Sequence, residues 1–111
     1  MSNRTVEEGV QPQGVDEEIS YTLTTTAVGS TPTTVSVKVY DQSNDYTDVT
    51  ATVMPTGSPS VVGDVITLPA LKLLTLGRLY RVEVKYTVSG NIIETWFTVL
   101  AERYQAAKQY W

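Results

Sequence analysis

One stretch of the chain decides its fold: LLTLGRLYRVEV, residues 73–84. It opens with leucines, turns at Gly77, and then places Tyr80 ahead of residues that alternate between charged and apolar. This order is typical of a tyrosine corner, in which the ring packs in the core and the hydroxyl bonds to the backbone upstream. We therefore expect Leu76, Gly77 and Tyr80 to define the fold, as the corner that leads into the penultimate strand of an antiparallel β-sandwich.

Alternation of apolar and polar residues with a period of two continues on both sides of this corner. Downstream it runs from 80 to 88, stops at Ser89-Gly90-Asn91, and resumes from 92 to 100. Glycine and asparagine tolerate the positive φ of tight turns, so these runs predict a β-hairpin. Upstream, the same period predicts shorter strands at residues 19–24, 35–40, 49–53 and 65–68. About seven short strands predict an all-β antiparallel sandwich over residues 19–100.

The composition bounds the possible functions. The chain has 111 residues, 41% of them apolar and 18% charged, which suits one domain with a buried core. It contains no cysteine and no histidine, which excludes disulfides, thiolate metal sites and Ser-His-Asp or Cys-His catalysis. A net charge of −4 with scattered basic residues disfavours nucleic acid. No apolar run approaches the ~20 residues that span a bilayer, so we expect no membrane partner.

Residues 1–18 differ from the rest of the chain. The segment contains Pro12 and two glycines, its valines are widely separated, and no helical or strand period survives. We interpret it as an extended N-terminal arm. It is either a disordered leader or an arm that drapes over a neighbouring subunit, with Val6, Val10 and Val15 as anchors that become ordered only in the assembly.

The last segment, residues 101–111, changes character again. Alanine, glutamine, glutamate and lysine favour a helix, and an apolar stripe includes Tyr104 and Trp111. We expect a short C-terminal helical tail, which is too short to be stable without a surface to dock on. Either it packs on its own sandwich or frays, or Tyr104, Tyr110 and Trp111 bind a partner.

One loop carries a group of alternate oxygen side chains that resembles a calcium site: Asp41, Ser43, Asp45 and Asp48. However, Tyr46 stands where an EF-hand loop needs glycine, and Thr52 stands where it needs glutamate. Aspartate and serine are also ordinary turn residues. We therefore interpret the loop as a solvated turn and expect no metal and no cofactor.

Paired carboxylates are the remaining route to catalysis. Glu83 and Glu94 fall on neighbouring predicted strands, but Arg81 and Lys85 lie beside them, which indicates a surface charge ladder. A domain of this size also offers little room for the cleft that a glycosidase needs. We expect no enzymatic activity and no catalytic residues.

Aromatic residues in or near the strands allow a different kind of site. Trp96, Tyr40, Tyr46 and Tyr86 would form a platform for sugars if they were exposed on one face. The simpler interpretation is that most of these rings fill the core. A free-standing carbohydrate-binding or cell-surface module therefore remains a second alternative.

Six segments together resemble small immunoglobulin-like structural proteins of tailed bacteriophages, which include head-decoration and head- or tail-adaptor proteins. These segments are residues 11–17 (QPQGVDE), 21–26 (YTLTTT), 49–55 (VTATVMP), 60–68 (SVVGDVITL), 77–86 (GRLYRVEVKY) and 90–94 (GNIIE). The corner segment is also similar to fibronectin type III domains.

This resemblance implies an immunoglobulin- or fibronectin-III-like sandwich at residues 19–100, between the arm and the helical tail. It implies a virion structural protein made in the bacterial host cytoplasm, most directly a capsid decoration protein that binds the capsid surface through its termini and sheet edges. The alternative is a neck, tail or fibre adaptor. The implied partners are major capsid or neck and tail proteins, and further copies in a homo-oligomer or lattice. No catalytic residues carry over from this family.

Overall fold

The computed structural model describes residues 2–5, 10–27, 29, 31–55 and 57–102. Within these residues the chain forms nine β-strands, one 3₁₀ helix and one short α-helix. In chain order these are β1 (Ser2–Thr5), β2 (Val10–Gly14), β3 (Ile19–Thr24), β4 (Thr33–Asp41), η1 (Gln42–Asn44), β5 (Thr47–Asp48), α1 (Thr50–Val53), β6 (Ser60–Val62), β7 (Val65–Thr67), β8 (Leu79–Val88) and β9 (Asn91–Glu102).

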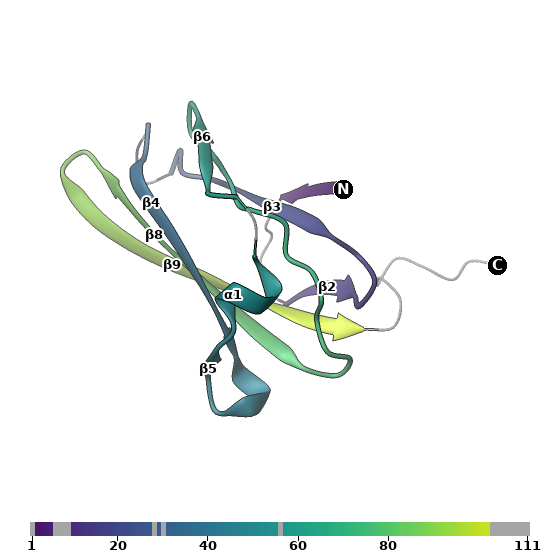
Figure 1. Ribbon diagram of the computed structural model, residues 1–111. Coiled ribbons are helices and arrows are strands. Elements are labelled where there is room, and N and C mark those ends of the chain that lie inside the picture. Colours follow the sequence, from purple (N-terminus) through teal and green to yellow (C-terminus); the bar gives the residue numbers. More distant parts are fainter. Residues whose placement is uncertain (1, 6–9, 28, 30, 56, 103–111) are drawn as a thin grey trace.

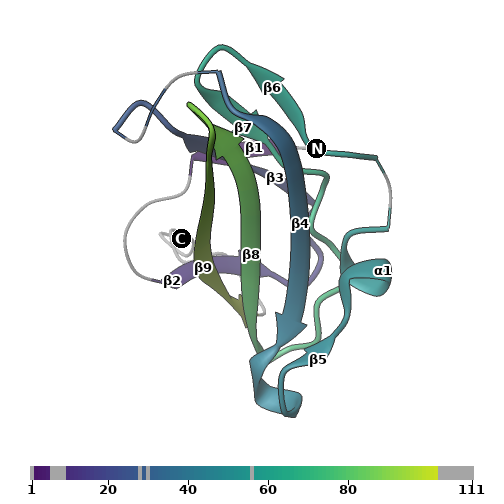
Figure 2. The same cartoon turned by 90° about the vertical axis from the view of Figure 1, so that its left-hand side faces the viewer.

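The strands form two sheets that face each other (Figures 1 and 2). The four-stranded sheet has the order β1-β3-β7-β6, and the five-stranded sheet has the order β2-β9-β8-β4-β5. Neighbouring strands are antiparallel, except that β1 runs parallel to β3 and β2 runs parallel to β9. The predicted all-β sandwich is confirmed.

The core lies between the sheets and follows from the alternation in the strands. In β8 every second side chain, from Tyr80 to Val88, is buried, and β9 adds Phe97 from the same sheet. From the opposite sheet, β3 contributes Tyr21, whose ring centroid lies 5.2 Å from that of Phe97. A tilted aromatic pair of this kind adds about 0.5–1.5 kcal/mol beyond the area that it buries.

The tyrosine corner has the predicted geometry. Tyr80 is buried, and its hydroxyl oxygen accepts a hydrogen bond of 2.8 Å from the backbone N–H of Thr75. Gly77 has a φ of +84°, a conformation that favours glycine, and its N–H donates to the carbonyl of Ala101 at 2.9 Å. The corner is thereby tied to the last residues of β9.

The leucine that the corner buries differs from the one that the sequence indicates. Leu76 is 50% exposed, while Leu74 is 6% exposed and belongs to the core. Leu76 lies within the turn itself, so its side chain faces solvent. Leu76 is thus part of the turn of the corner, while Leu74 supplies the buried leucine.

The predicted hairpin between β8 and β9 is present, and its turn has two residues, Ser89 and Gly90, while Asn91 already belongs to β9. Ser89 and Gly90 have φ values of +50° and +79°. Two consecutive positive φ values are the signature of a type I′ turn, whose twist matches that of the flanking strands.

Residues 50–53 form the short helix α1 and Val49 is its N-cap, so the prediction of a strand at 49–53 is wrong. The Asp48 carboxylate accepts hydrogen bonds from the N–H and the hydroxyl of Thr50, at 3.0 and 2.7 Å. The N–H groups of Thr52 and Val53 then donate to the carbonyl of Val49. These local bonds outweigh the weak strand preference of threonine and valine.

The N-terminal segment is partly built into the sandwich. Strand β2 pairs with the last five residues of β9. Gln13, which is fully buried, donates to the carbonyls of Leu71 at 2.8 Å and Glu17 at 3.1 Å. Its Oε1 accepts from the Tyr21 hydroxyl at 3.0 Å. The extended conformation expected for residues 10–14 is thus held by the chain's own core.

The C-terminal segment begins as strand rather than helix. Ala101 and Glu102 belong to β9, and Ala101 is buried. The remainder of the predicted helical tail, residues 103–111, lies outside the described residues.

Candidate binding face of the five-stranded sheet

The outer face of the five-stranded sheet carries the polar side chains of its three central strands, β4, β8 and β9. Figure 2 shows these strands side by side. Because side chains alternate along a strand, burying one set of β4, β8 and β9 residues turns the other set outward. The register aligns these outward residues in three rows across the sheet. The rows are Ser36–Lys85–Glu94, Lys38–Glu83–Trp96 and Tyr40–Arg81–Thr98.

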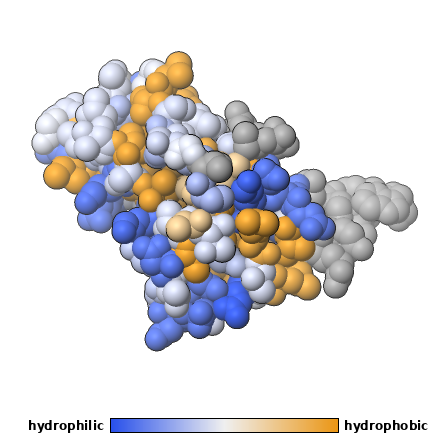
Figure 3. Space-filling model, in the orientation of Figure 1, coloured by the Kyte–Doolittle hydropathy of each residue, from blue (hydrophilic) through white to orange (hydrophobic). Residues whose placement is uncertain are grey.

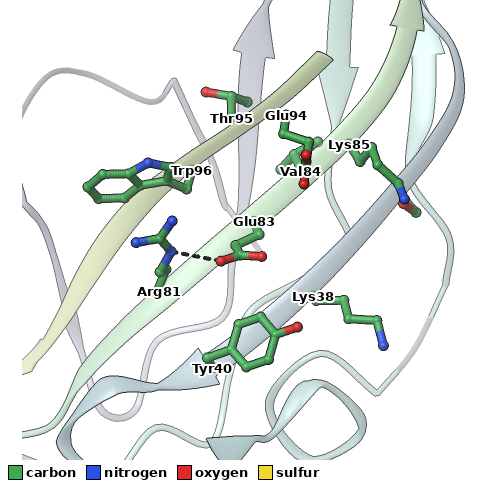
Figure 4. Close-up of a pocket in the computed structure, with 10 residues that line it drawn as sticks. Lys38, Tyr40, Arg81, Glu83, Val84, Lys85, Glu94, Thr95 and Trp96 are labelled. Carbon is green, nitrogen blue, oxygen red and sulfur yellow. Dashed lines mark hydrogen bonds and ion pairs between the residues drawn. The ribbon is translucent and has the colours of Figure 1, made fainter. Parts of the chain in front are cut away.

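Trp96 is the most prominent side chain of this face, and it is 54% exposed. The guanidinium carbon of Arg81 lies 4.2 Å from the centroid of a Trp96 ring, which is a cation–π contact. The Nε of Arg81 donates to Oε2 of Glu83 at 2.8 Å, as Figure 4 shows. Arg81 is therefore held from two sides, and it in turn restricts the orientation of the indole.

A hollow of about 300 Å³ lies against Trp96. Its lining combines two aromatic rings, three cations, two carboxylates, two small polar side chains and one valine (Figure 4): Tyr40, Trp96, Lys38, Arg81, Lys85, Glu83, Glu94, Ser36, Thr95 and Val84. Lys38 also lies 3.6 Å from the Asp48 carboxylate. The charges of the hollow are nearly balanced, although the whole chain carries −4.

The structure separates the four aromatic residues that the sequence singles out. Trp96 and Tyr40 line the same hollow. Tyr46 is 52% exposed but belongs to the turn after η1, where its hydroxyl accepts from Gln42. Tyr86 is buried in the core. Sequence reasoning did not include Arg81 or Lys38 in the platform, although both share the outward position in the alternation with Trp96 and Tyr40.

The two carboxylates considered for catalysis both lie at this hollow, on neighbouring strands. Glu83 is paired with Arg81, as the predicted charge ladder requires, and its side chain is 40% exposed. Glu94 is directly opposite Lys85 in the register and is exposed.

The acidic loop is arranged as a turn. Asp41 is buried, its Oδ1 accepts from the N–H of Ser43 at 3.0 Å, and its Oδ2 pairs with Arg78 at 2.8 Å. The carboxylate of Asp48 is bound to Thr50, and these hydrogen bonds hold the pKa of Asp48 below its usual value. Among the described residues, no group of three or more acidic side chains is placed to hold a metal ion.

The partner-binding residues expected at the ends of the chain divide into two sets. Val10 is half-exposed on edge strand β2, and Val15 is partly buried against the core of its own chain. The other four lie outside the residues whose side chains are described: Val6, Tyr104, Tyr110 and Trp111.

Comparisons of the chain with protein-family models, with curated proteins and with solved structures found no match. Of the helices in the described residues, none has the length and apolar character to cross a membrane.

Proposed function

We propose that the chain is a non-enzymatic structural protein of a bacteriophage virion, specifically a capsid decoration protein. It binds the capsid surface through its termini and sheet edges and stands as one copy in a lattice. The resemblance to small immunoglobulin-like phage proteins supports this role. A particle protein of this kind needs a rigid module with exposed contact surfaces, and it needs no reactive groups.

The strand order supports the immunoglobulin-like part of this proposal. Immunoglobulin sandwiches place strands A-B-E-D in one sheet and G-F-C in the other, and variable-type domains add C′ beside C. Here β1-β3-β7-β6 follows A-B-E-D, and β9-β8-β4-β5 follows G-F-C-C′. Tyr80 stands near the start of β8, where strand F carries its tyrosine corner. The parallel pairing of β1 with β3 departs from the antiparallel sheets of that fold.

The observation that carries the proposal is a pair of exposed leucines beside the end of β9. Leu73 is 64% exposed and Leu76 is 50% exposed, in the connection between β7 and β8. The neighbouring Gly77 N–H is bonded to Ala101, so this connection adjoins the end of β9 at Glu102. Exposed apolar side chains that are close in the chain are typical of contact sites, and these lie beside the end of β9.

The backbone at Leu73 adds to this argument. Its φ is +59°, a left-handed conformation that is unusual for a bulky residue. Such a conformation costs about 1–3 kcal/mol and persists where the surrounding structure enforces it, often at functional sites. The strain holds a large apolar side chain in solvent, which suits a residue that is covered by a partner.

A second exposed apolar group provides a matched control. Val62 and Ile92 are 79% and 72% exposed, at the tips of the β6–β7 and β8–β9 hairpins. Both hairpins lie at the end of the sandwich away from the corner, and Figure 3 shows apolar surface at the top, where β6 lies in Figure 1. Because β9 carries the chain away from this end, we assign it to the outer side of the particle.

The test is incorporation into phage particles that encode the chain. We expect mass spectrometry to find the chain in purified particles, and immunogold labelling to mark their heads. The Leu73→Gly/Leu76→Ser variant should fold and be lost from particles, whereas Val62→Ser/Ile92→Ser should be incorporated normally. Absence of the wild-type chain from particles would overturn the proposal. Gold on the neck or tail would replace decoration by the adaptor role.

A further inference from the structure

We infer that the hollow on the outer face of the five-stranded sheet binds an uncharged saccharide, which stacks on Trp96. This inference concerns a property of the isolated chain, and it does not depend on the proposed place of the protein in a particle. Three features carry it: a half-exposed indole of restricted orientation, hydrogen-bond donors and acceptors in the same hollow, and a hollow of suitable size.

The indole is prepared for stacking. An exposed tryptophan with no neighbours would have to be ordered when a ligand binds, at a cost in side-chain entropy. Here Arg81 covers part of the ring system at 4.2 Å and is itself fixed by Glu83, so much of that ordering is already present. With 54% of Trp96 still exposed, apolar surface remains for the C–H face of a pyranose ring.

The polar groups match the chemistry of sugar hydroxyls. Each hydroxyl both donates and accepts, so it is satisfied best where donors and acceptors alternate. Among the described residues the Nζ of Lys85 and the carboxylate of Glu94 have no hydrogen bond or ion pair. The side chain of Arg81 donates a hydrogen bond only from its Nε. All three groups line the hollow together with Trp96; in Figure 4 Arg81 lies against the indole, whereas Glu94 and Lys85 lie further along the strands.

The charge balance favours a neutral ligand over a polyanion. Three cations and two carboxylates line the hollow, and one of the cations already pairs with one of the carboxylates. An anionic polysaccharide or a nucleic acid would meet both Glu83 and Glu94 at close range. Binding of such polymers depends on a field of unpaired cations, which this face lacks.

The size of the hollow limits the ligand to a short saccharide. Small-molecule sites in proteins usually measure about 300–1,000 Å³. At about 300 Å³ and open on one side, this hollow lies at the lower end of that range. It fits a terminal sugar unit of a longer glycan, with the rest of the glycan in solvent.

The experiment uses the full chain with Trp111→Phe, which leaves Trp96 as the single tryptophan of the two in the sequence. A glycan array of neutral, sialylated and sulfated oligosaccharides selects the probe, and the strongest neutral oligosaccharide is titrated by tryptophan fluorescence and calorimetry. We expect quenching of Trp96 on binding. We also expect affinity to survive about 0.5 M salt, because screening at that concentration weakens ionic binding but not stacking.

Variants decide whether Trp96 is the site. Trp96→Ala should lower affinity about tenfold or more, and Glu94→Gln should weaken binding less. Tyr46→Ala is the matched control, because it removes an equally exposed ring away from the hollow, and it should leave affinity unchanged. Circular dichroism checks that each variant folds. The inference is overturned if no neutral glycan binds, if sulfated or sialylated glycans bind more tightly, or if a folded Trp96→Ala variant binds normally.

Discussion

Tyr80 and Tyr21 are both buried tyrosines with hydrogen-bonded hydroxyls, but they join different kinds of segment. The Tyr80 hydroxyl accepts from the N–H of Thr75, five residues upstream. The Tyr21 hydroxyl donates to Gln13, and Gln13 donates to the carbonyl of Leu71, 58 residues further along the chain. The first contact closes one corner, whereas the second fastens three distant segments together.

This difference explains which of the two is visible in the sequence. All parts of the Tyr80 corner lie within a dozen consecutive residues, so their order alone predicts the contact. The parts of the Gln13 network are ordinary residues in separate segments, and only the folded chain brings them together. A glutamine beside Pro12 in a polar stretch gives no sign that it will be fully buried.

Gln13→Ala tests the long-range hydrogen bonds of Gln13, and we expect it to cost the most stability. It removes the side chain that bonds to Tyr21, Leu71 and Glu17, and it leaves buried polar groups without that partner. Each such group costs about 1–3 kcal/mol, so we expect the free energy of unfolding to fall by about 3 kcal/mol in urea titrations. This loss would exceed that from removing the Tyr80 hydroxyl alone.

The control for this prediction is Gln42→Ala. Gln42 also donates from Nε2 to a tyrosine hydroxyl, that of Tyr46, but the pair is exposed. We expect a change below about 0.5 kcal/mol, because water replaces the lost bond. Equal losses for the two variants would mean that β2 is not held by its buried glutamine.

Local patterns predicted most of the strands, and the failure at residues 49–53 has a definite physical cause. The alternation in β8 and β9 and the turn at Ser89-Gly90 were readable because each depends only on neighbouring residues. Residues 49–53 carry the same alternation, but residues 50–53 form α1, since the Asp48 carboxylate bonds to Thr50. A side chain that competes for backbone hydrogen bonds overrides a weak preference, and a pattern of apolar residues does not record it.

The candidate site was predictable only in part, for a related reason. Trp96 stands out as a residue type. Because it lies two residues after Glu94, the alternation along β9 places both side chains on the outer face once β9 is recognised. Its contact with Arg81 depends on the register between β8 and β9, which no local pattern fixes. Register across strands is a non-local property, like the Gln13 network.

Tyr80→Phe tests the local hydrogen bond of the tyrosine corner, and we expect a smaller loss of stability than for Gln13→Ala. The ring is retained, and only the acceptor for the Thr75 N–H is lost. We expect a loss of about 1–1.5 kcal/mol in urea titrations, and faster hydrogen exchange at the Thr75 amide. Tyr86→Phe is the control, because Tyr86 is equally buried and has no hydrogen bond among the described residues, so its loss should be near zero. Unchanged exchange at Thr75 would contradict the corner.

Ser89→Asn should stabilise the turn between β8 and β9, which also depends only on neighbouring residues. Ser89 has a φ of +50°, and asparagine adopts this conformation more readily than serine at the first position of a type I′ turn. We expect a gain of about 0.5 kcal/mol, measured by thermal unfolding. Ser89→Val should reverse the sign, because a β-branched residue is strained at positive φ. A gain from valine would show that this turn is not of the type I′ class.

Asp48→Asn, for which we expect the smallest effect, tests the hydrogen bonds between Asp48 and Thr50 that the pattern of apolar residues does not record. Hydrogen bonds from the side chain and backbone of Thr50, with a lesser contribution from Lys38, lower the pKa of Asp48 in the folded state. Because the folded pKa lies below the ordinary value of about 3.9, the charged form stabilises the fold above that pH, and this contribution is lost as pH falls through the folded pKa. Asp48→Asn lacks this titration, so the stability difference between wild type and variant should shrink as pH falls below about 4. The side chain is 47% exposed, which keeps the difference at neutral pH below about 1 kcal/mol. A difference that stayed constant down to about pH 2.5 would mean that Thr50 does not favour the ionised carboxylate, and the start of α1 would then need another cause.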